Sequence, residues 1–172
     1  MGELYNLSMK ITTKTGDKGE TSLFGGCRVR KDSTYIMLVG EIDELQAFVA
    51  FCKTCEGVEN DVKKALEKII DDLYRVMSII GFEMKVPNSI REIEEEDVDF
   101  LDSLIEKYKA EVEDVNKFVR PGASEKSARF HLARSVCRRA EREIVKAELK
   151  KSEMILKYLN RLSDALFVFS LL

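Results

Sequence analysis

Apolar residues recur at alternating spacings of three and four along most of the chain, which places each set on one face of an amphipathic helix. No clear hairpin signal interrupts them, so the pattern predicts an all-α fold, a five-helix bundle. The five sets comprise Leu38, Ile42, Leu45, Val49 and Cys52; Val62, Leu66, Ile69, Leu73, Val76 and Ile80; Val98, Leu101, Ile105, Tyr108 and Val112; Ala133, Val136, Cys137, Ala140, Ile144 and Ala147; and Ile155, Leu159, Leu162, Leu166 and Phe169.

The breaks between these sets carry residues that end or start helices. The only two prolines, Pro87 and Pro121, lie between registers, as expected of residues that interrupt helices. Ser124 is a suitable N-cap for the fourth helix. The acidic run from Glu92 to Asp99 reads as the solvated start of the third helix, with its charges at the favourable end, and we assign it no chemistry.

The segment from residue 13 to residue 26 lacks this helical pattern and gathers glycines, hydroxyls and lysines. Glycines allow backbone N–H groups to turn inward as an anion-binding nest, and Lys14 and Lys18 add positive charge. The order of residues is not that of a Walker A loop, which needs Gly-Lys-Ser/Thr opening a helix. The segment is therefore either a flexible polar loop or a polyphosphate-binding loop, depending on what faces it.

Length and composition favour one domain, because 172 residues with 45% hydrophobic content fill one core. A net charge of −3 gives no overall basic footprint, so extended nucleic-acid binding is not expected. No apolar run approaches the ~20 residues of a membrane span, and residues 1–10 lack the apolar core of a signal peptide. We therefore expect a soluble, cytoplasmic protein without a membrane or nucleic-acid partner.

Four cysteines invite a redox or zinc reading, since Cys52 and Cys55 form a C-x-x-C pair. A thioredoxin-like motif needs a βαβ setting, and a zinc site needs a second pair of ligands. Here the pair lies in a helical pattern, so we interpret these residues as helix thiols and expect no protein metal site. A di-iron bundle is excluded, because Ala128 stands where a Glu-x-x-His pair with His131 needs glutamate.

The fourth helix carries a cationic stripe that contains one carboxylate. At 100° per residue, Arg134, Arg138, Glu141 and Arg142 fall within roughly a third of the circumference, whereas Arg139 points elsewhere. The glutamate can orient guanidinium groups that then clamp phosphate oxygens in a two-pronged geometry. The alternative is a solvated face with intrahelical ion pairs.

Two further polar positions adjoin apolar registers. Asn160 and Asp164 lie one turn apart on a shared face of the fifth helix. Asp43 follows the register residue Ile42 in the first helix, so it is either a solvated charge or the partner of an arginine on another helix or subunit.

The loop, the stripe and the Asn160 segment occur in the order and at the separations of one family. The chain resembles the PduO-type corrinoid adenosyltransferases from about residue 10 to the C-terminus. The motifs that carry the resemblance are Thr13-Lys14-Thr15-Gly16-Asp17-Lys18-Gly19 with Gly25-Gly26, Val39-Gly40-Glu41-Ile42-Asp43-Glu44-Leu45, Arg134-x-x-Cys137-Arg138-Arg139-Ala140-Glu141-Arg142, and Tyr158-Leu159-Asn160-Arg161-Leu162-Ser163-Asp164.

This resemblance implies a fold and a reaction. It implies a single ferritin-like domain, with residues 1–33 as an N-terminal ATP-binding segment and residues 34–172 as the helical bundle. The bundle would assemble as a homotrimer with active sites between neighbouring subunits. ATP would donate its 5′-deoxyadenosyl group to the cobalt of cob(I)alamin, giving adenosylcobalamin and triphosphate. Mg²⁺ would accompany ATP, and a reductase partner is possible.

The resemblance also assigns site residues, motif by motif. The corrinoid-facing residue would be Phe118, whose ring would occupy the lower face of cobalt and exclude an axial ligand. The catalytic residues would be Arg134, Arg138, Glu141 and Asp43. The ATP-binding residues would be Thr13, Lys14, Thr15, Gly16, Thr21, Ser22, Lys31, Arg138, Glu141, Arg142 and Asn160.

The chain departs from the family pattern in the segment after Phe118. Family members usually read Leu-Pro-Gly-Gly where this chain has Arg120-Pro121-Gly122-Ala123, and Cys27 replaces a residue that is commonly charged. Two other functions compete with the transferase: a trimer that binds ATP or delivers a corrinoid without any transfer, and a structural bundle without a ligand. Triphosphate release distinguishes the first, and the effect of Arg142→Ala on binding distinguishes the second.

Overall fold

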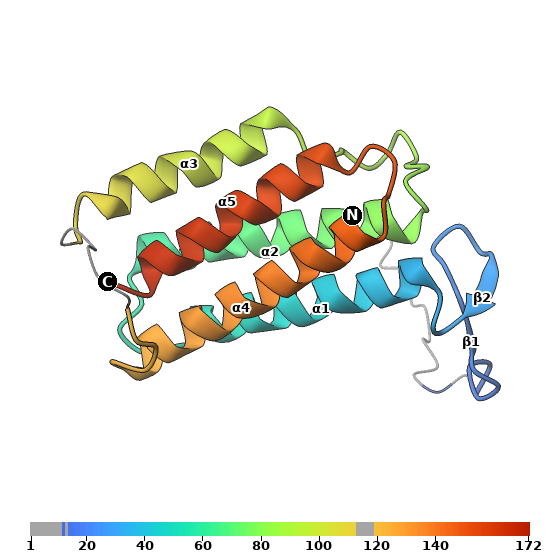
Figure 1. Ribbon diagram of the computed structural model, residues 1–172, viewed down its shortest axis with the longest axis horizontal. Helices are drawn as coiled ribbons and strands as arrows, with labels where there is room; N and C mark the ends of the chain where they lie inside the picture. Colours follow the sequence, from blue (N-terminus) through green and yellow to red (C-terminus); the bar gives the residue numbers. More distant parts are fainter. Residues whose placement is uncertain (1–11, 13, 113–118) are drawn as a thin grey trace, which may run out of the picture.

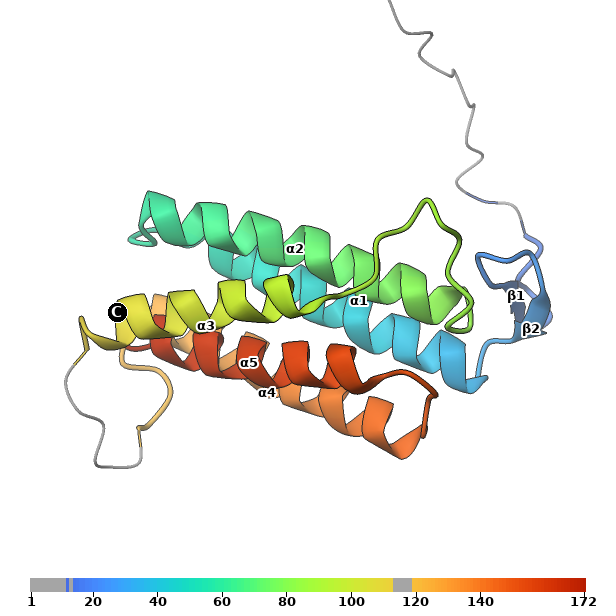
Figure 2. The same cartoon turned by 90° about the horizontal axis from the view of Figure 1, so that it is seen from above.

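Five helices form the body of the protein, and a small hairpin lies at one end of it (Figures 1 and 2). The computed structural model describes residue 12 and residues 14–112 and 119–172. The helices are α1 (Thr34–Lys53), α2 (Asn60–Gly81), α3 (Glu95–Lys109), α4 (Glu125–Lys146) and α5 (Glu153–Phe169). Helix α1 packs against α2 and α4, α5 packs against α4, and α3 covers the outer side of α5. The predicted five-helix bundle is confirmed.

The predicted apolar registers form the core. Every register residue that we assigned to α1, α2 and α5 is buried, as are those of α4 except Ala147, which caps its C-terminus. Ser124 caps α4 as expected, because its hydroxyl accepts a hydrogen bond from the Ser127 N–H at 3.0 Å. Helix α3 ends before Val112, so the third register is shorter than its pattern suggested.

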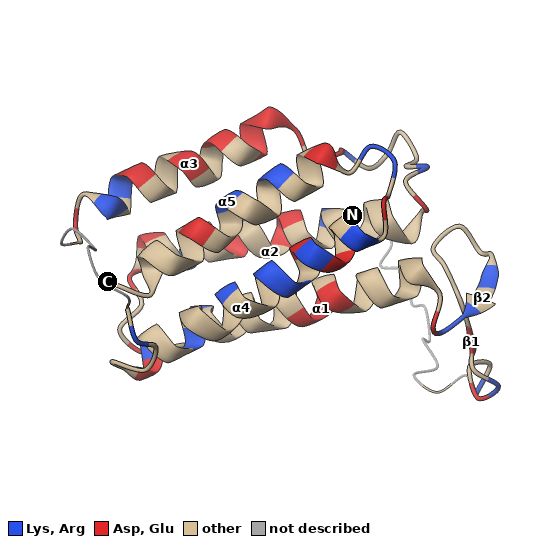
Figure 3. Cartoon of the chain, viewed as in Figure 1, with Lys and Arg blue, Asp and Glu red and all other residues tan. Residues whose placement is uncertain are grey.

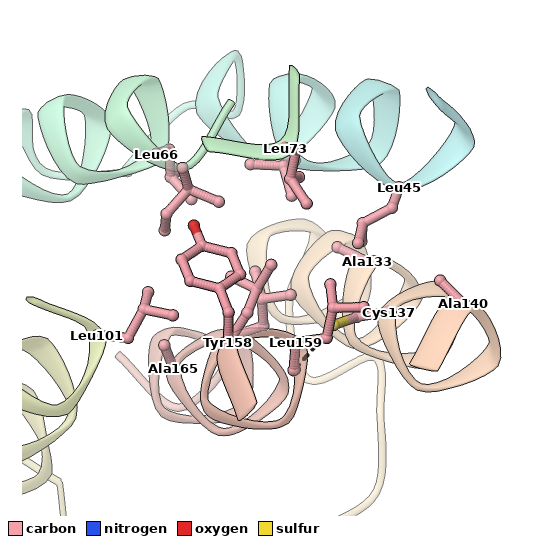
Figure 4. Packing of buried hydrophobic residues seen from close by; sticks show 14 of the residues in the cluster. Leu45, Leu66, Leu73, Leu101, Ala133, Cys137, Ala140, Tyr158, Leu159 and Ala165 are labelled. Carbon is pink, nitrogen blue, oxygen red and sulfur yellow. Dashed lines mark hydrogen bonds between the residues drawn. The ribbon is translucent and has the colours of Figure 1, made fainter. Parts of the chain in front are cut away.

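Tyr158 and Cys137 show how polar groups are accommodated in this core (Figure 4). The Tyr158 ring lies among aliphatic side chains with its hydroxyl directed toward α2, where it donates a hydrogen bond to Asp72 Oδ2 at 3.0 Å. The thiol of Cys137 lies 3.2 Å from the carbonyl oxygen of Leu159 and joins α4 to α5. Both groups are buried and both have a partner, as buried polar groups require.

The acidic start of α3 differs from the expectation of a solvated run. Asp97 is only 1% exposed, and it accepts hydrogen bonds from Arg75 at 2.8 Å and Lys68 at 3.3 Å. Arg75 also donates to Asp72 at 2.6 Å, so one buried cluster joins α2 to α3. The run is therefore solvated only in part, because Asp97 turns inward to pair with cations of α2, which the sequence order does not reveal.

A two-stranded antiparallel sheet precedes the bundle and was not predicted. Strand β1 (Glu20–Ser22) pairs with β2 (Arg28–Arg30), with Thr21 opposite Val29. The strands are too short for an alternating pattern to be visible in the sequence. Gly26 has a φ of +83° in the connecting turn, a conformation that glycine adopts without strain. The hairpin lies beside the N-terminal end of α1 (Figure 1).

Candidate functional site

The segment before α1 forms a cationic hollow. Its lining includes the predicted residues Lys14, Thr15 and Ser22, and its volume is about 720 Å³. Arg28 also lines it and donates a hydrogen bond from Nη2 to the carbonyl oxygen of Thr15 at 2.9 Å. Lys18 adds another positive charge to the lining, and Asp17 adds its single negative charge. The hollow therefore combines cations with small hydroxyl groups, the chemistry that polyphosphate requires.

Gly16 and Lys31 meet in this segment although fifteen positions separate them. A Cβ atom added at Gly16 would lie 3.1 Å from Lys31 Nζ, so the ammonium group lies directly over the glycine. The backbone brings them together, because the Lys31 N–H donates to the Gly19 carbonyl at 2.9 Å and the Gly19 N–H donates to the Gly16 carbonyl at 3.2 Å. Thr21 is half-buried in β1. Thr13 lies outside the described residues.

Phe24 holds this segment against the bundle, and the sequence analysis did not identify it. A Cβ atom at Gly81 of α2 would lie 2.6 Å from the Phe24 ring, so the ring occupies the space that the missing side chain leaves. The Phe24 N–H donates to the Gly81 carbonyl at 3.2 Å, and its ring lies 5.8 Å from that of Phe82. The glycine at the end of α2 was the available signal, because a helix tolerates glycine there for close packing.

The arginines of α4 divide into paired and unpaired groups. Arg139 bonds to Glu41 of α1 at 2.7 Å and contacts Glu44, in agreement with its predicted direction away from the stripe. Arg138 and Arg142 are exposed, and within the described residues neither makes an ion pair. Figure 3 shows basic residues along α4 beside acidic residues of α1. Two guanidinium groups thus remain available to an anionic ligand.

Glu141 lies between these two arginines and contacts the fifth helix. Its Oε1 accepts a hydrogen bond from Asn160 Nδ2 at 3.3 Å. The contact between Cys137 and Leu159 lies one turn away along α4 and holds the two helices together there. The structure therefore brings the predicted residues of α4 and α5 into one group.

A second hollow lies at the N-terminal end of α4. It has a volume of about 730 Å³ and is mainly apolar, with His131 and Arg134 among its polar groups. The Arg134 guanidinium lies 5.3 Å from the centre of the Phe167 ring. Burial and the nearby Arg134 charge lower the pKa of His131, which favours its neutral imidazole form. The other residues that line this hollow are Val119, Pro121, Gly122, Ala128, Leu132 and Ser135.

Phe118 lies outside the described residues, although the next residue, Val119, lines this second hollow. Asp43 is exposed on α1 and makes no ion pair with any described residue, Arg134 included. The family resemblance also implies an ion pair between Asp43 and Arg134 across a subunit boundary. No such pair forms within the described residues of one chain, so the pair between subunits stays a prediction.

The two hollows lie far apart in one chain. Helix α4 begins near the apolar hollow and runs toward the end of the bundle where the hairpin lies (Figure 1). A helix rises about 1.5 Å per residue, so Arg134 and Arg142 are separated by roughly 12 Å along α4. The structure therefore does not bring the N-terminal residues and the Arg134 hollow together into one pocket.

The model of the cobalamin adenosyltransferase family matches residues 11–172. A cobalamin adenosyltransferase of Cupriavidus metallidurans is 38% identical, with 96% of this chain and 88% of that protein covered. The corrinoid adenosyltransferase PduO of Salmonella typhimurium is 34% identical over 94% of this chain, which spans about half the length of that relative, 49%.

Solved structures show the same similarity. A variant of the PduO-type ATP:corrinoid adenosyltransferase from Lactobacillus reuteri, complexed with cobalamin and ATP, superimposes with a TM-score of 0.84 at 30% identity and covers 94% of this chain and 89% of that one. Another variant of that enzyme, complexed with ATP, gives a TM-score of 0.82 at 29% identity, with 94% and 92% covered. The resemblance proposed from the sequence motifs is confirmed, and the chain belongs to the cobalamin adenosyltransferase family.

Proposed function

We propose that this chain transfers the 5′-deoxyadenosyl group of ATP to the cobalt of cob(I)alamin, which makes it an ATP:corrinoid adenosyltransferase. The enzyme class and its two substrates are those of its family and of the related structures complexed with cobalamin and ATP. Among the described residues, the observation that carries the proposal is the group formed by Arg138, Glu141, Arg142 and Asn160. It offers two unpaired guanidinium groups beside a fixed carboxylate and amide.

The reaction explains why no protein nucleophile is needed. The cobalt(I) centre of the substrate supplies the electron pair for the new Co–C5′ bond, while the C5′–O bond of ATP breaks and its electrons leave on triphosphate. The protein must therefore hold C5′ in line with cobalt and stabilise the charge of the departing triphosphate. Fixed cations and hydrogen-bond donors meet both demands.

We assign the triphosphate to the cations that the structure leaves available. Arg138 and Arg142 would clamp phosphate oxygens in bidentate hydrogen bonds, which are about twice as strong as neutral ones. The N-terminal segment would hold the remaining phosphate groups through Lys14 of the hollow and through Lys31 beside Gly16. Its further ATP-binding residues would be Thr13, Thr15, Gly16, Thr21 and Ser22. Its cationic lining and its hydroxyl groups support this assignment.

We assign the corrinoid to the apolar hollow at the start of α4. A corrin ring is a wide, flat and largely apolar group, and the hollow offers a matching apolar lining with few polar groups. Phe118 would cover the lower face of cobalt. Excluding an axial donor there would make reduction to Co(I) easier, because no ligand then raises the energy of the added electrons.

We further propose that the protein acts as a homotrimer. The separation of the cationic and apolar hollows within one chain supports this, because a neighbouring subunit can bring its own loop to the apolar end of α4. Asp43 and Arg134 make no ion pair with each other within the described chain, so they are available to pair across such a boundary. Arg134 would then be held by Asp43 while it stacks on Phe167.

Four smaller assignments complete the proposal. Residues 1–33 would serve as the ATP-binding segment and residues 34–172 as the bundle of a single domain. Mg²⁺ would accompany the triphosphate through phosphate oxygens, and a reductase could supply the electron for cobalt.

The four cysteines are free, which fits a reducing cytoplasm. Within the described residues, no helix combines the length and the apolar character that a bilayer span requires.

An anaerobic assay with chemically reduced cobalamin and ATP tests the function. We expect the Co(I) absorbance to disappear only when ATP is present, with adenosylcobalamin as the product. Binding of ATP and cobalamin without any loss of the Co(I) spectrum would instead identify a carrier. The matched pair Arg142→Ala and Arg139→Ala tests the clamp: we expect only the first to weaken ATP binding, since Arg139 is already bonded to Glu41.

A further inference from the structure

Four side chains from three helices are joined by a continuous series of polar contacts. Asp102 Oδ1 of α3 forms an ion pair with Arg161 Nε of α5 at 2.8 Å. Arg161 Nη1 donates to Asn160 Oδ1 at 3.0 Å, and Asn160 Nδ2 donates to Glu141 Oε1 of α4 at 3.3 Å. These contacts therefore link α3 to the Glu141 carboxylate, which lies between the unpaired arginines of α4.

The two ends of the Asn160 amide are chemically unlike, and its neighbours distinguish them. A guanidinium can only donate hydrogen bonds, so Arg161 can contact only the amide oxygen. An ionised carboxylate can only accept, so Glu141 can contact only the amide NH₂ group. A flipped amide would place NH₂ against the cation and oxygen against the anion, and both contacts would become repulsive. Arg161 and Glu141 together therefore permit one orientation.

The contact between Arg161 and Asn160 is not an automatic result of their adjacency. Neighbouring residues of a helix point about 100° apart and do not face each other. Arg161 reaches back because Asp102 binds its Nε, and the rigid fork of the guanidinium then directs Nη1 toward Asn160. A lysine has one ammonium group and no such fork, so it cannot satisfy both partners with the same geometry.

We propose that Arg161 is a positioning residue that fixes the orientation of the Asn160 amide, and with it the Glu141 carboxylate, for ATP. This inference rests on the proposed function, in which Asn160 and Glu141 bind ATP. Asn160 can then present a defined polar atom to the nucleotide instead of exchanging between two amide orientations. Arg161 itself need not touch the nucleotide, since its guanidinium is already bonded to Asp102 and Asn160.

Arg161→Met removes the donors and keeps a helix-favouring side chain of similar length. We measure the Kd of ATP by isothermal titration calorimetry and expect it to rise about fivefold, since one charge-assisted hydrogen bond on a partly exposed amide is lost. Lys157→Met is the matched control, because Lys157 also joins α5 to α3, through Glu95, one turn away without contacting Asn160. We expect its Kd for ATP to stay within about twofold of the wild type.

A double-mutant cycle tests whether Arg161 acts through Asn160. In an Asn160→Ala background, Arg161→Met should have no further effect on the Kd of ATP. Arg161→Lys should recover part of the lost affinity. Equal effects of Arg161→Met and Lys157→Met would show that the ion pairs only attach α3 to α5. An undiminished effect of Arg161→Met in the Asn160→Ala background would also overturn the proposal.

These outcomes are separate from those of the proposed function. If the wild type binds ATP without turnover and Arg161→Met weakens that binding, the proposed transferase function is wrong while the positioning role of Arg161 holds. If the wild type turns over and Arg161→Met leaves the Kd of ATP unchanged, the positioning role fails alone. A wild type that does not bind ATP would overturn both.

Discussion

Replacement of Asp97 by asparagine should change how the stability of the protein depends on pH. Asp97 is buried at the start of α3 and contacts Arg75 and Lys68 of α2. Burial by itself raises the pKa of this carboxyl group, but hydrogen bonds from Arg75, the Glu94 N–H and Lys68 outweigh it and lower the pKa from 3.8 to about 2. The ionised form is therefore much more favourable in the folded state than in the unfolded chain.

The magnitude follows from this difference in pKa. At about 1.4 kcal/mol for each pKa unit, the ionised Asp97 contributes about 2.5 kcal/mol to the free energy of unfolding at neutral pH. Because the folded-state pKa is the lower one, this contribution is fully present above about pH 5 and is lost as the pH falls through 3.8 toward 2. By pH 3 about 1 kcal/mol of it should be gone.

The assay is urea unfolding at fixed protein concentration, followed by far-UV circular dichroism between pH 6 and pH 3. We expect the stability difference between the wild type and Asp97→Asn to shrink by about 1 kcal/mol over this range. Asp99→Asn removes an exposed carboxylate of the same helix and should change stability by less than about 0.5 kcal/mol. A difference between the wild type and Asp97→Asn that stays constant from pH 6 to pH 3 would refute the reasoning.

Three further perturbations test other parts of the molecule. Arg142→Ala should raise the KM for ATP at least tenfold at unchanged thermal stability. Arg139→Ala should instead lower the free energy of unfolding by about 1 kcal/mol, measured by urea unfolding. A raised KM in Arg139→Ala and a lowered stability in Arg142→Ala would contradict the phosphate clamp. Gly81→Ala should displace the Phe24 ring and weaken ATP binding in calorimetry while far-UV circular dichroism stays unchanged; an unchanged Kd would show that this contact does not position the segment. Phe118→Ala should slow the reaction that starts from Co(II) more than the one that starts from preformed Co(I), and equal losses would argue against the axial-ligand role.

The helices could be predicted because each one buries a continuous stripe. The residues of α2, from Val62 to Ile80, follow a three-and-four spacing that only one face of a helix can satisfy. Ser124 could be named as a cap because its hydroxyl satisfies a free N–H group of the first turn. Such local patterns need no knowledge of the partner helix.

The contacts between elements could not be predicted, because they depend on which elements meet. Asp97 belongs to an acidic run whose composition predicts exposure to solvent, and only the position of α3 in the bundle brings it within reach of Arg75 of α2. Phe24 looks like a loop residue until α2 ends with Gly81 beneath it. Short strands such as β1 carry too few residues for an alternating pattern.

The candidate site was predictable in part for the same reason. The angular sorting of α4 correctly separated Arg139 from the stripe, since helix geometry fixes that direction. The contact of Glu141 with Asn160 joins two helices, and only the family motifs assigned both residues to one site. The roles of these residues toward ATP, and those of Thr13 and Phe118, stay predictions.

The central claim is that ATP is cleaved at C5′ and its deoxyadenosyl group moves to cobalt. The most direct test is the ratio of triphosphate released to cobalt alkylated in a single anaerobic turnover with limiting cob(I)alamin. We expect one triphosphate for each adenosylcobalamin formed. Release of ADP and phosphate, or no triphosphate at all while both substrates bind, would contradict the claim.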